Sequence, residues 1–407
     1  MTASTPPRVP GTPGLLRTIN DRAALELLLD EGPMTRSRIG DRTGVSRPTA
    51  SQIVARLEQS GLIEPTGAVQ GARGPQAVTY AARTDVVVGL ALDVVPTGVR
   101  ASVVDALGTT LGESTVRSGP DRTAVGDVRT AWGEACAAAG IPASRVGAVV
   151  VGVQAAAEPR TGDLTLVGEL PGWPRHGLRT HLEAELGVGF RIENDVNLAA
   201  IAERDAGRSE SSFTLLWLGE GIGLGSWVDG RVHRGTAGGA GEIGYLPIVA
   251  GAAGDDSVNV QDLVGGLRVA EVAARAGVPG VVAGTSYGEA VAAVAAHRGT
   301  AAHEAFVADM AARVAVVLQP VVAILEPDAM VLGGPTGVAG GPALAEATAR
   351  VLGATDQAAG TIVTSAVTEL AVLRGARSVV AQDVRSLLLA AAGRPDHAPV
   401  VPSTVPG

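Results

Sequence analysis

The chain has 407 residues, of which 46% are hydrophobic and only 2% aromatic, and its formal net charge is −9. This length suits two or three domains built around a large aliphatic core. The single cysteine, Cys136, excludes an internal disulfide framework, and the sequence shows neither a signal peptide nor an apolar run of about 20 residues, so a cytoplasmic protein that does not enter a membrane is expected.

The charge is divided unevenly along the chain. Residues 1–83 contain ten arginines and seven acidic residues, a net charge of +3, so the remaining residues carry −12. A basic N-terminal part on an acidic body predicts that only the N-terminal part meets a polyanion.

Residues 1–13 are rich in Pro, Thr and Ser, a composition typical of a disordered tail. Asn20 or Asp21 is expected to cap a first helix, which Gly32-Pro33 ends. This helix opens a domain that is predicted to extend over residues 14–83.

Two shorter helices are predicted next. Thr35 is expected to cap a helix over residues 36–42, and Ser46 a helix over residues 47–59 whose apolar residues recur at the spacing of one buried face. A turn at Thr43-Gly44 separates the two helices. This arrangement is typical of a helix-turn-helix domain whose last helix enters the major groove of DNA.

A β-wing is predicted over residues 62–80, and Arg73 at its tip is placed to enter a minor groove. Side chains suited to phosphates and base edges gather on the second helix, the third helix and this tip. The predicted DNA contacts are Arg36, Arg38, Ser46, Arg47, Thr49, Ser51, Gln52, Arg56 and Arg73. The alternative is a small three-helix unit with a solvated polar face.

The body is predicted over residues 84–391, followed by a Pro-rich tail over 392–407. Its first two buried strands, over residues 86–92 and 99–104, are joined near Val95-Pro96-Thr97-Gly98. Helices and strands then alternate, which is typical of an α/β domain.

Asn194 and Asp195 follow a short predicted strand and precede a helix. A carboxylate beside a carboxamide at the C-terminal end of a strand is a suitable hydrogen-bonding pair for a hydroxyl group. The alternative is an Asx turn that caps the helix, and one pair of residues can do both.

A glycine-rich stretch extends over residues 216–248 and contains ten glycines. Val228-Asp229-Gly230-Arg231 is predicted to be a tight hairpin turn. Glu242 then lies in a glycine-flanked loop, where its carboxylate is available to a polyol. A purely structural glycine-rich hairpin is the alternative.

This stretch resembles the signature of the ROK family, a GxGxGxG hairpin followed by GxxGxAGEIGH, and companion motifs occur in the family's order. The resemblance implies the fold class: an N-terminal winged helix-turn-helix domain followed by a two-lobed actin-like α/β body with a cleft. It also implies that Asn194, Asp195 and Glu242 bind a sugar. In ROK kinases the matching aspartate is the general base.

The chain departs from the kinase pattern in three places. The phosphate loop Asp-Ile-Gly-Gly-Thr is here Asp93-Val94-Val95-Pro96-Thr97, which has no glycine and includes a proline without an N–H donor. The motif's histidine is Tyr245, and a sugar-contacting glutamate aligns with Gln261. The family's zinc cysteines are absent, so no metal and no cofactor are expected. The predicted ligand contacts are Asn194, Asp195, Glu242, Tyr245 and Gln261.

The sequence therefore predicts a non-enzymatic transcriptional regulator, a repressor, that binds an operator in double-stranded DNA as a homodimer or homotetramer. A sugar or sugar derivative in the cleft would control its operator affinity. Two alternatives remain open: a ROK sugar kinase with an appended DNA-binding head, and a ligand-independent repressor whose cleft has decayed.

Overall fold

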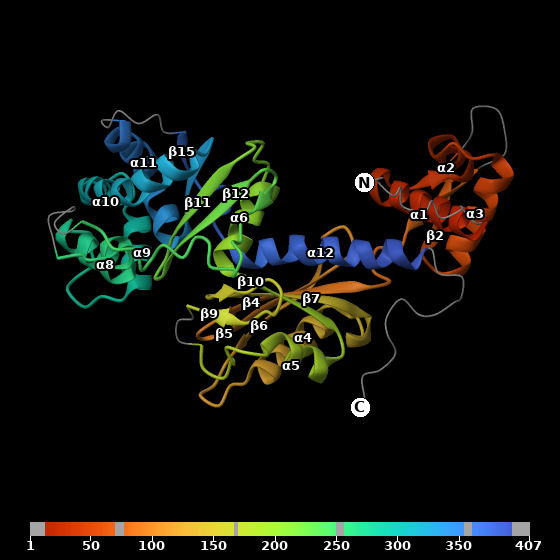
Figure 1. The fold of residues 1–407 in the computed structure, drawn as a ribbon, viewed down its shortest axis with the longest axis horizontal. Helices are drawn as coiled ribbons and strands as arrows, with labels where there is room; N and C mark the ends of the chain where they lie inside the picture. Colours follow the sequence, from red (N-terminus) through yellow and green to blue (C-terminus); the bar gives the residue numbers. More distant parts are fainter. Residues whose placement is uncertain (1–12, 70–76, 167–169, 250–255, 354–359, 393–407) are drawn as a thin grey trace, which may run out of the picture.

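The computed structural model describes residues 13–69, 77–166, 170–249, 256–353 and 360–392. The chain forms a head and a body of two lobes, and one long helix, α12 (Ala371–Ala391), runs from between the lobes to the head (Figure 1). Apart from residues 13 and 392, the two predicted tails lie outside the described residues, as does the wing tip with Arg73.

The head is a winged helix-turn-helix domain, as predicted. In chain order it comprises α1 (Pro13–Glu31), β1 (Met34–Thr35), α2 (Arg36–Thr43), α3 (Arg47–Gln59), β2 (Ile63–Val69) and β3 (Ala77–Ala82). The three strands form an antiparallel sheet in the order β1-β3-β2. The side chains of Thr35 and Ser46 accept hydrogen bonds from the first turns of α2 and α3, which confirms both predicted N-caps.

The first helix differs from its prediction. α1 begins at Pro13, a residue that fits the first turn of a helix, so Asn20 and Asp21 lie inside the helix and cap nothing. The Asp21 carboxylate is buried and accepts hydrogen bonds from Nε and Nη2 of Arg56 in α3, at 2.8 and 2.5 Å. The predicted cap was wrong because the partner of Asp21 is a distant arginine and not the backbone of its own helix.

The first lobe is built on a mixed five-stranded sheet. It comprises β4 (Val88–Val95), β5 (Gly98–Val104), β6 (Thr110–Arg117), α4 (Ala124–Ala139), the 3-10 turn Ala143–Arg145, β7 (Val146–Val153), β8 (Ala156–Ala157), β9 (Leu164–Thr165), α5 (Leu178–Leu186) and β10 (Gly189–Asn194). α6 (Asp195–Asp205) follows directly and leads to the second lobe.

The second lobe carries most of the helices. It comprises β11 (Phe213–Leu218), β12 (Ile222–Val228), β13 (Arg231–Val232), α7 (Val260–Val264), α8 (Gly266–Arg275), α9 (Tyr287–Ala296), α10 (Ala301–Leu325), β14 (Ala329–Gly333), α11 (Gly334–Gly353) and β15 (Thr361–Thr364). The predicted hairpin turn joins β12 to β13, and Asp229 and Gly230 there both have positive φ, as a type I′ turn requires.

The two lobes repeat one topology. The first sheet has the order β10-β7-β4-β5-β6 and the second β15-β14-β11-β12-β13. Each begins with an antiparallel meander and continues with two parallel strands. This duplication is the two-lobed α/β body expected from the sequence, and it brings the carboxyl ends of corresponding strands toward the space between the lobes.

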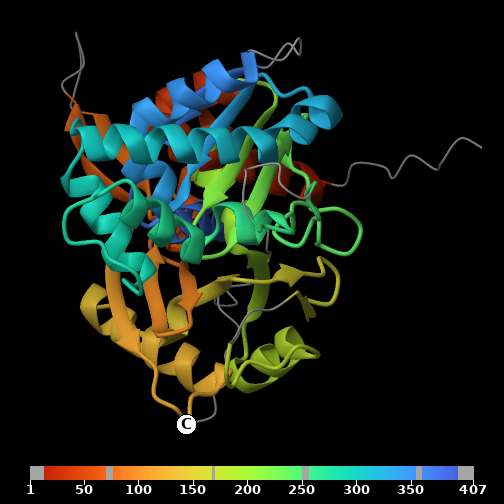
Figure 2. The ribbon, with the colours of Figure 1, turned by 90° about the vertical axis from the view of Figure 1, so that its left-hand side faces the viewer.

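α6 and α12 pack against each other between the two sheets (Figures 1 and 2). They touch at Gly375, where an added Cβ would lie 1.9 Å from the carbonyl oxygen of Leu198, so only glycine fits. The far end of α12 enters the head, where Leu388 and Leu389 share a hydrophobic core with Leu25 of α1. One continuous helix therefore belongs to both the body and the head.

α10 is long and apolar enough to cross a membrane by length and composition alone, but 56% of its apolar window is buried in the protein. Phe306, Met310 and Leu318 are fully buried in the core of the second lobe. In this structure α10 is a core helix, onto which α8 and α11 pack.

Candidate functional sites: the recognition helix and the interlobe cleft

The third helix of the head, α3, has one buried and one free face. Its buried face consists of Ala50, Ile53, Val54 and Leu57. On the other face Arg47, Ser51 and Gln52 are exposed, and Arg47 has no ion-pair partner within the described residues. A free cation beside two hydrogen-bonding side chains is the arrangement that phosphate and base-edge contacts require.

The N-terminal end of α3 is organised by Ser46. Its Oγ accepts a hydrogen bond from the backbone N of Thr49 and lies 2.8 Å from the Thr49 Oγ1. Both hydroxyls therefore sit at the positive end of the helix dipole, which favours a nearby phosphate. The structure places Ser46, Arg47 and Thr49 together at this end.

Three other arginines that were predicted to contact DNA interact with side chains of the head. The guanidinium of Arg36 donates to the Tyr80 hydroxyl and lies 5.1 Å from the centre of its ring. Arg38 lies 3.9 Å from Glu31, although its side chain is mostly exposed. Arg56 is bound to Asp21, so in this conformation it ties α3 to α1.

In the body, the structure brings Asn194 and Glu242 together. Asn194 caps α6 through its Oδ1, which accepts a hydrogen bond from the backbone N of Asn197 at 3.0 Å. Its Nδ2 lies 3.1 Å from the carbonyl oxygen of Ala155 and 3.4 Å from Oε1 of Glu242. Asn194 therefore caps the helix and also donates a hydrogen bond to Glu242, which fixes the orientation of that carboxylate.

Asp195 stands beside this pair and is half-buried. Burial raises its pKa to about 7, and the negative charges of Asp93 and Glu242 act in the same direction, whereas a hydrogen bond from the backbone N of Val196 opposes them. Burial also raises the pKa of Glu242. A carboxyl group that titrates near neutral pH can exchange a proton with a hydroxyl, or accept its hydrogen bond.

Asp195 faces a cavity of about 250 Å³ between the lobes. Its walls come from β4 and β5, from the start of α6, from β11, from the first turn of α11 and from the segment that begins α12. The lining residues are Asp93, Val95, Arg100, Gln154, Asp195, Trp217, Gly334, Pro335, Val338, Val367, Thr368, Leu370, Ala371 and Val372. Its size suits a small polar ligand, and the described residues include no group of three or more side chains placed to hold a metal ion.

Asp93 and Arg100 form an ion pair in this cavity that the sequence analysis missed. The two residues are opposite each other in the β4–β5 ladder, and Nη1 of Arg100 lies 2.9 Å from Oδ2 of Asp93. Burial raises the pKa of Asp93, while Arg100 acts in the opposite direction. Pairing the two strands across the turn at Pro96-Thr97 would have revealed this contact.

The structure gives the other two predicted ligand contacts different surroundings. The carboxamide of Gln261 accepts from the backbone N of Ile222 at 3.1 Å and donates to the carbonyl oxygen of Glu220 at 2.7 Å, so it holds the turn between β11 and β12. The side chain of Tyr245 is 69% exposed. Within the described residues neither side chain forms a hydrogen bond with Asn194 or Asp195.

Two glycines of the signature are required by close packing of the chain on itself. At Gly241 an added Cβ would lie 1.8 Å from the carbonyl oxygen of Leu224, and at Gly238 it would lie 2.0 Å from that of Ala157. Both glycines also have positive φ. They press the loop that carries Glu242 onto β12 and onto the first lobe, which sets the position of the carboxylate.

The family comparisons agree with this division into head and body. The profile of the ROK family matches residues 89–383, which is more than half of the chain, and the profile of the MarR family matches residues 15–74. The first match covers both lobes, and the second covers α1 to the beginning of the wing.

Curated relatives include kinases and repressors. A beta-glucoside kinase of Listeria monocytogenes is 39% identical over 90 residues, which cover 22% of this chain and 31% of the kinase. A xylose repressor of Caldicellulosiruptor bescii is 25% identical over 244 residues, which cover 58% of this chain and 61% of the repressor. The chain thus spans from about a third to about three-fifths of the length of the curated relatives it matches.

Solved structures share the fold. A ROK family transcriptional regulator, described as a homologue of the E. coli Mlc protein, has a TM-score of 0.67 at 18% identity, and the match covers 92% of this chain and 99% of that structure. A ROK family glucokinase from Streptomyces griseus, solved with glucose and AMPPNP, has a TM-score of 0.59 at 21% identity and covers 72% of this chain and 99% of its own. Together with the profile match over both lobes, this shared fold leads to one conclusion: the chain belongs to the ROK family.

Proposed function

We propose that this protein is a DNA-binding transcriptional regulator, a repressor, whose operator affinity is controlled by a sugar or sugar derivative bound beside Asn194, Asp195 and Glu242. The observation that carries the proposal is the course of α12. Leu370, Ala371 and Val372 line the interlobe cavity together with Asp195, the one of the three proposed ligand contacts that lines it, and Leu388 and Leu389 lie in the core of the head. A helix of 21 residues spans about 30 Å, so α12 joins the two sites as one rigid element.

α6 is a second connection between the ligand site and α12. Its first turn carries Asp195, and its last turn carries the buried Glu203. The Glu203 carboxylate accepts hydrogen bonds from the backbone N of Ala366 at 3.3 Å and of Val367 at 3.1 Å, just before α12 begins. A ligand that moves α6 therefore also moves the base of α12, and this coupling requires different ligand affinities in the two positions.

The β4–β5 turn supports a regulator over a kinase. It consists of Pro96 and Thr97 alone, since Val95 and Gly98 are already paired in the ladder. Nη1 of Arg122 binds the carbonyl oxygens of Val95 and Pro96, at 3.1 and 2.7 Å. A phosphate loop instead offers several free N–H groups, so this turn is a poor cradle for ATP.

One observation favours a kinase as the second candidate. The pKa of Asp195, raised to about 7, suits the general base that removes a proton from a sugar hydroxyl. The test is incubation with ATP, magnesium and a panel of hexoses, followed by detection of ADP. Sugar-dependent ADP release that Asp195→Asn abolishes would show that the protein is a kinase and would contradict the assignment as a regulator.

A single head can reach only a short stretch of DNA, and we propose that the protein acts as a homodimer or homotetramer on a pseudo-palindromic operator. Light scattering gives the mass of the free protein and of its complex with DNA. A single chain on each operator would contradict this part of the proposal.

The experiment that tests the function is fluorescence anisotropy of the purified chain on DNA from upstream of its gene, at fixed salt, with a panel of sugars. Operator binding that one sugar weakens or strengthens is the expected result. Binding that no sugar changes would favour a ligand-independent repressor with a decayed cleft. An Arg47→Ala chain that binds this DNA as tightly as the wild type would contradict the assigned recognition helix.

A further inference from the structure

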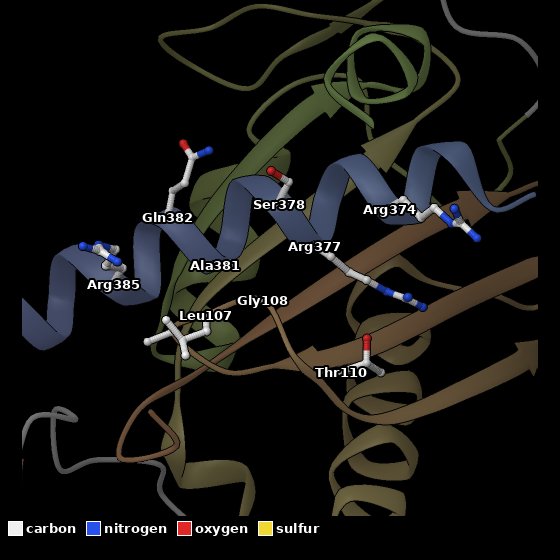
Figure 3. Close-up of a pocket in the computed structure, with 10 residues that line it drawn as sticks. Leu107, Gly108, Thr110, Arg374, Arg377, Ser378, Ala381, Gln382 and Arg385 are labelled. Carbon is white, nitrogen blue, oxygen red and sulfur yellow. The ribbon is translucent and has the colours of Figure 1, made fainter. Parts of the chain in front are cut away.

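A second cavity, separate from the interlobe cleft, lies between α12 and the turn that joins β5 to β6 (Figure 3). Its volume is about 440 Å³. The lining residues are Ala106, Leu107, Gly108, Thr110, Arg374, Arg377, Ser378, Ala381, Gln382 and Arg385. None of them belongs to the sites discussed above.

Three arginines line this groove along one side of α12. Arg374, Arg377 and Arg385 follow the spacing of one helix face and span about 16 Å. Arg374 and Arg377 extend toward the same end of the groove, where Thr110 contributes a hydroxyl group (Figure 3). This end therefore combines two cations with a neutral hydrogen-bonding group.

The positive charge of this end is only partly compensated. Arg374 is exposed and has no ion-pair partner in the part of the chain that the structure describes. Arg377 pairs with Glu113, but its buried Nε meets no hydrogen-bond acceptor among the described residues. Burial lowers the pKa of Arg377, and the nearby charge of Arg374 adds to this, while Glu113 opposes both.

The floor of the groove is rigid. The buried Asp105 accepts hydrogen bonds from the backbone N of Leu107 at 2.9 Å and of Thr109 at 2.8 Å, which fixes the β5–β6 turn. The carboxylates that pair with the arginines are about half exposed: Glu113 pairs with Arg377 and Asp30 of the head pairs with Arg385. Such surface pairs are weak, so an incoming anion can replace them.

We propose that this groove is a binding site for a small phosphate ester, whose phosphate is held by Arg374 and Arg377 while the rest of the molecule extends toward Arg385. Arginine pairs with phosphate by charge-assisted hydrogen bonds from a planar fork, which two adjacent guanidinium groups supply here. The alternative source of phosphate is the backbone of DNA, which the same side chains would contact.

The test is calorimetric titration of the full chain with glycerol 3-phosphate, with glycerol as the uncharged control. Arg374→Ala removes an exposed side chain and should preserve the fold, while Arg350→Ala on α11 is the matched control. We expect glycerol 3-phosphate to bind, Arg374→Ala and Arg377→Ala to weaken binding about tenfold or more, and Arg350→Ala to leave it unchanged. Circular dichroism checks that Arg377→Ala is folded.

A variant that is expected to strengthen ester binding provides a second test. Glu113→Gln removes the carboxylate that competes for Arg377, so it should tighten glycerol 3-phosphate binding several-fold. Absence of binding at millimolar concentration, equal weakening by Arg350→Ala, or loss of binding in Asp195→Ala, which would place the ester in the cleft, each overturns the proposal. Unchanged ester binding together with weaker DNA binding in Arg374→Ala would assign the groove to DNA.

Discussion

The head and the cleft present their predicted contact residues in opposite ways. On α3, Arg47, Ser51 and Gln52 stand exposed, and Arg47 is unpaired within the described residues. In the cleft, Asn194 is bonded to Glu242 and to the backbone of α6. The difference follows from the partner: a long polyanion attracts free charges over a wide surface, whereas a small neutral ligand requires hydrogen-bonding groups that are already oriented.

The largest effect is expected in the cleft. Asp195→Ala should weaken sugar binding about 10- to 150-fold, because it removes an oriented acceptor and a hydrogen bond to a charged group contributes about 1.5–3 kcal/mol. Operator binding without sugar should stay as in the wild type. Calorimetry of the sugar measures the first quantity and anisotropy the second.

Glu242→Ala should have the same effect, and Glu134→Ala, which changes an exposed acid of α4, serves as the control for both variants. Unchanged sugar response in both cleft variants would move the ligand to another site.

On α3, Arg47→Ala and Gln52→Ala should each weaken operator binding about tenfold, in line with about 1–3 kcal/mol for a base contact. Sugar affinity should not change. If Arg47 contacts a phosphate, its removal also reduces the slope of log affinity against log salt by about 1. Arg350→Ala is the control, and an equal loss there would show that the effect is nonspecific.

Arg56 tests whether a predicted DNA contact instead stabilises the head. Arg56→Ala leaves the carboxylate of Asp21 buried without its cation, so the free energy of unfolding should fall by about 2 kcal/mol. The salt dependence of operator binding should keep its slope. Urea denaturation measures the first effect, and Arg22→Ala, an exposed arginine of α1, is the control. A reduced slope without loss of stability would make Arg56 a DNA contact.

The smallest effect concerns pH. The folded pKa of Asp195 is about 7 and the ordinary value is 3.8, so between these values the folded chain keeps a proton that the unfolded chain releases. The free energy of unfolding therefore falls as the pH rises through this window. Asp195→Asn lacks this component and should gain on the order of 1 kcal/mol relative to wild type between pH 6 and pH 7. Equal pH dependence of the two proteins would contradict the raised pKa.

The sequence predicted what depends on short spacing. The caps at Thr35, Ser46 and Asn194 and the turn at Asp229-Gly230 involve neighbours within four residues, and all four are confirmed. The winged helix-turn-helix head and the two-lobed body followed from the same local patterns together with the family motifs.

Interactions between distant segments were the ones that the sequence did not reveal. The carboxylate of Asp21 binds a side chain 35 positions away, and Gln261 binds a turn 39 positions away. Asp and Gln side chains also occur in helix caps and in ligand contacts, so the sequence alone does not decide which role each residue has. The continuity of α12 from the cleft into the head also depends on packing that no motif encodes.

The central claim is that the cleft and the head are coupled through α12. The most direct test measures the dissociation constant of the active sugar with and without bound operator, and that of the operator with and without sugar. Thermodynamic linkage requires the two ratios to be equal, and we expect a ratio of about five or more. A sugar affinity that is the same with and without operator, in a chain that binds both, would contradict the coupling.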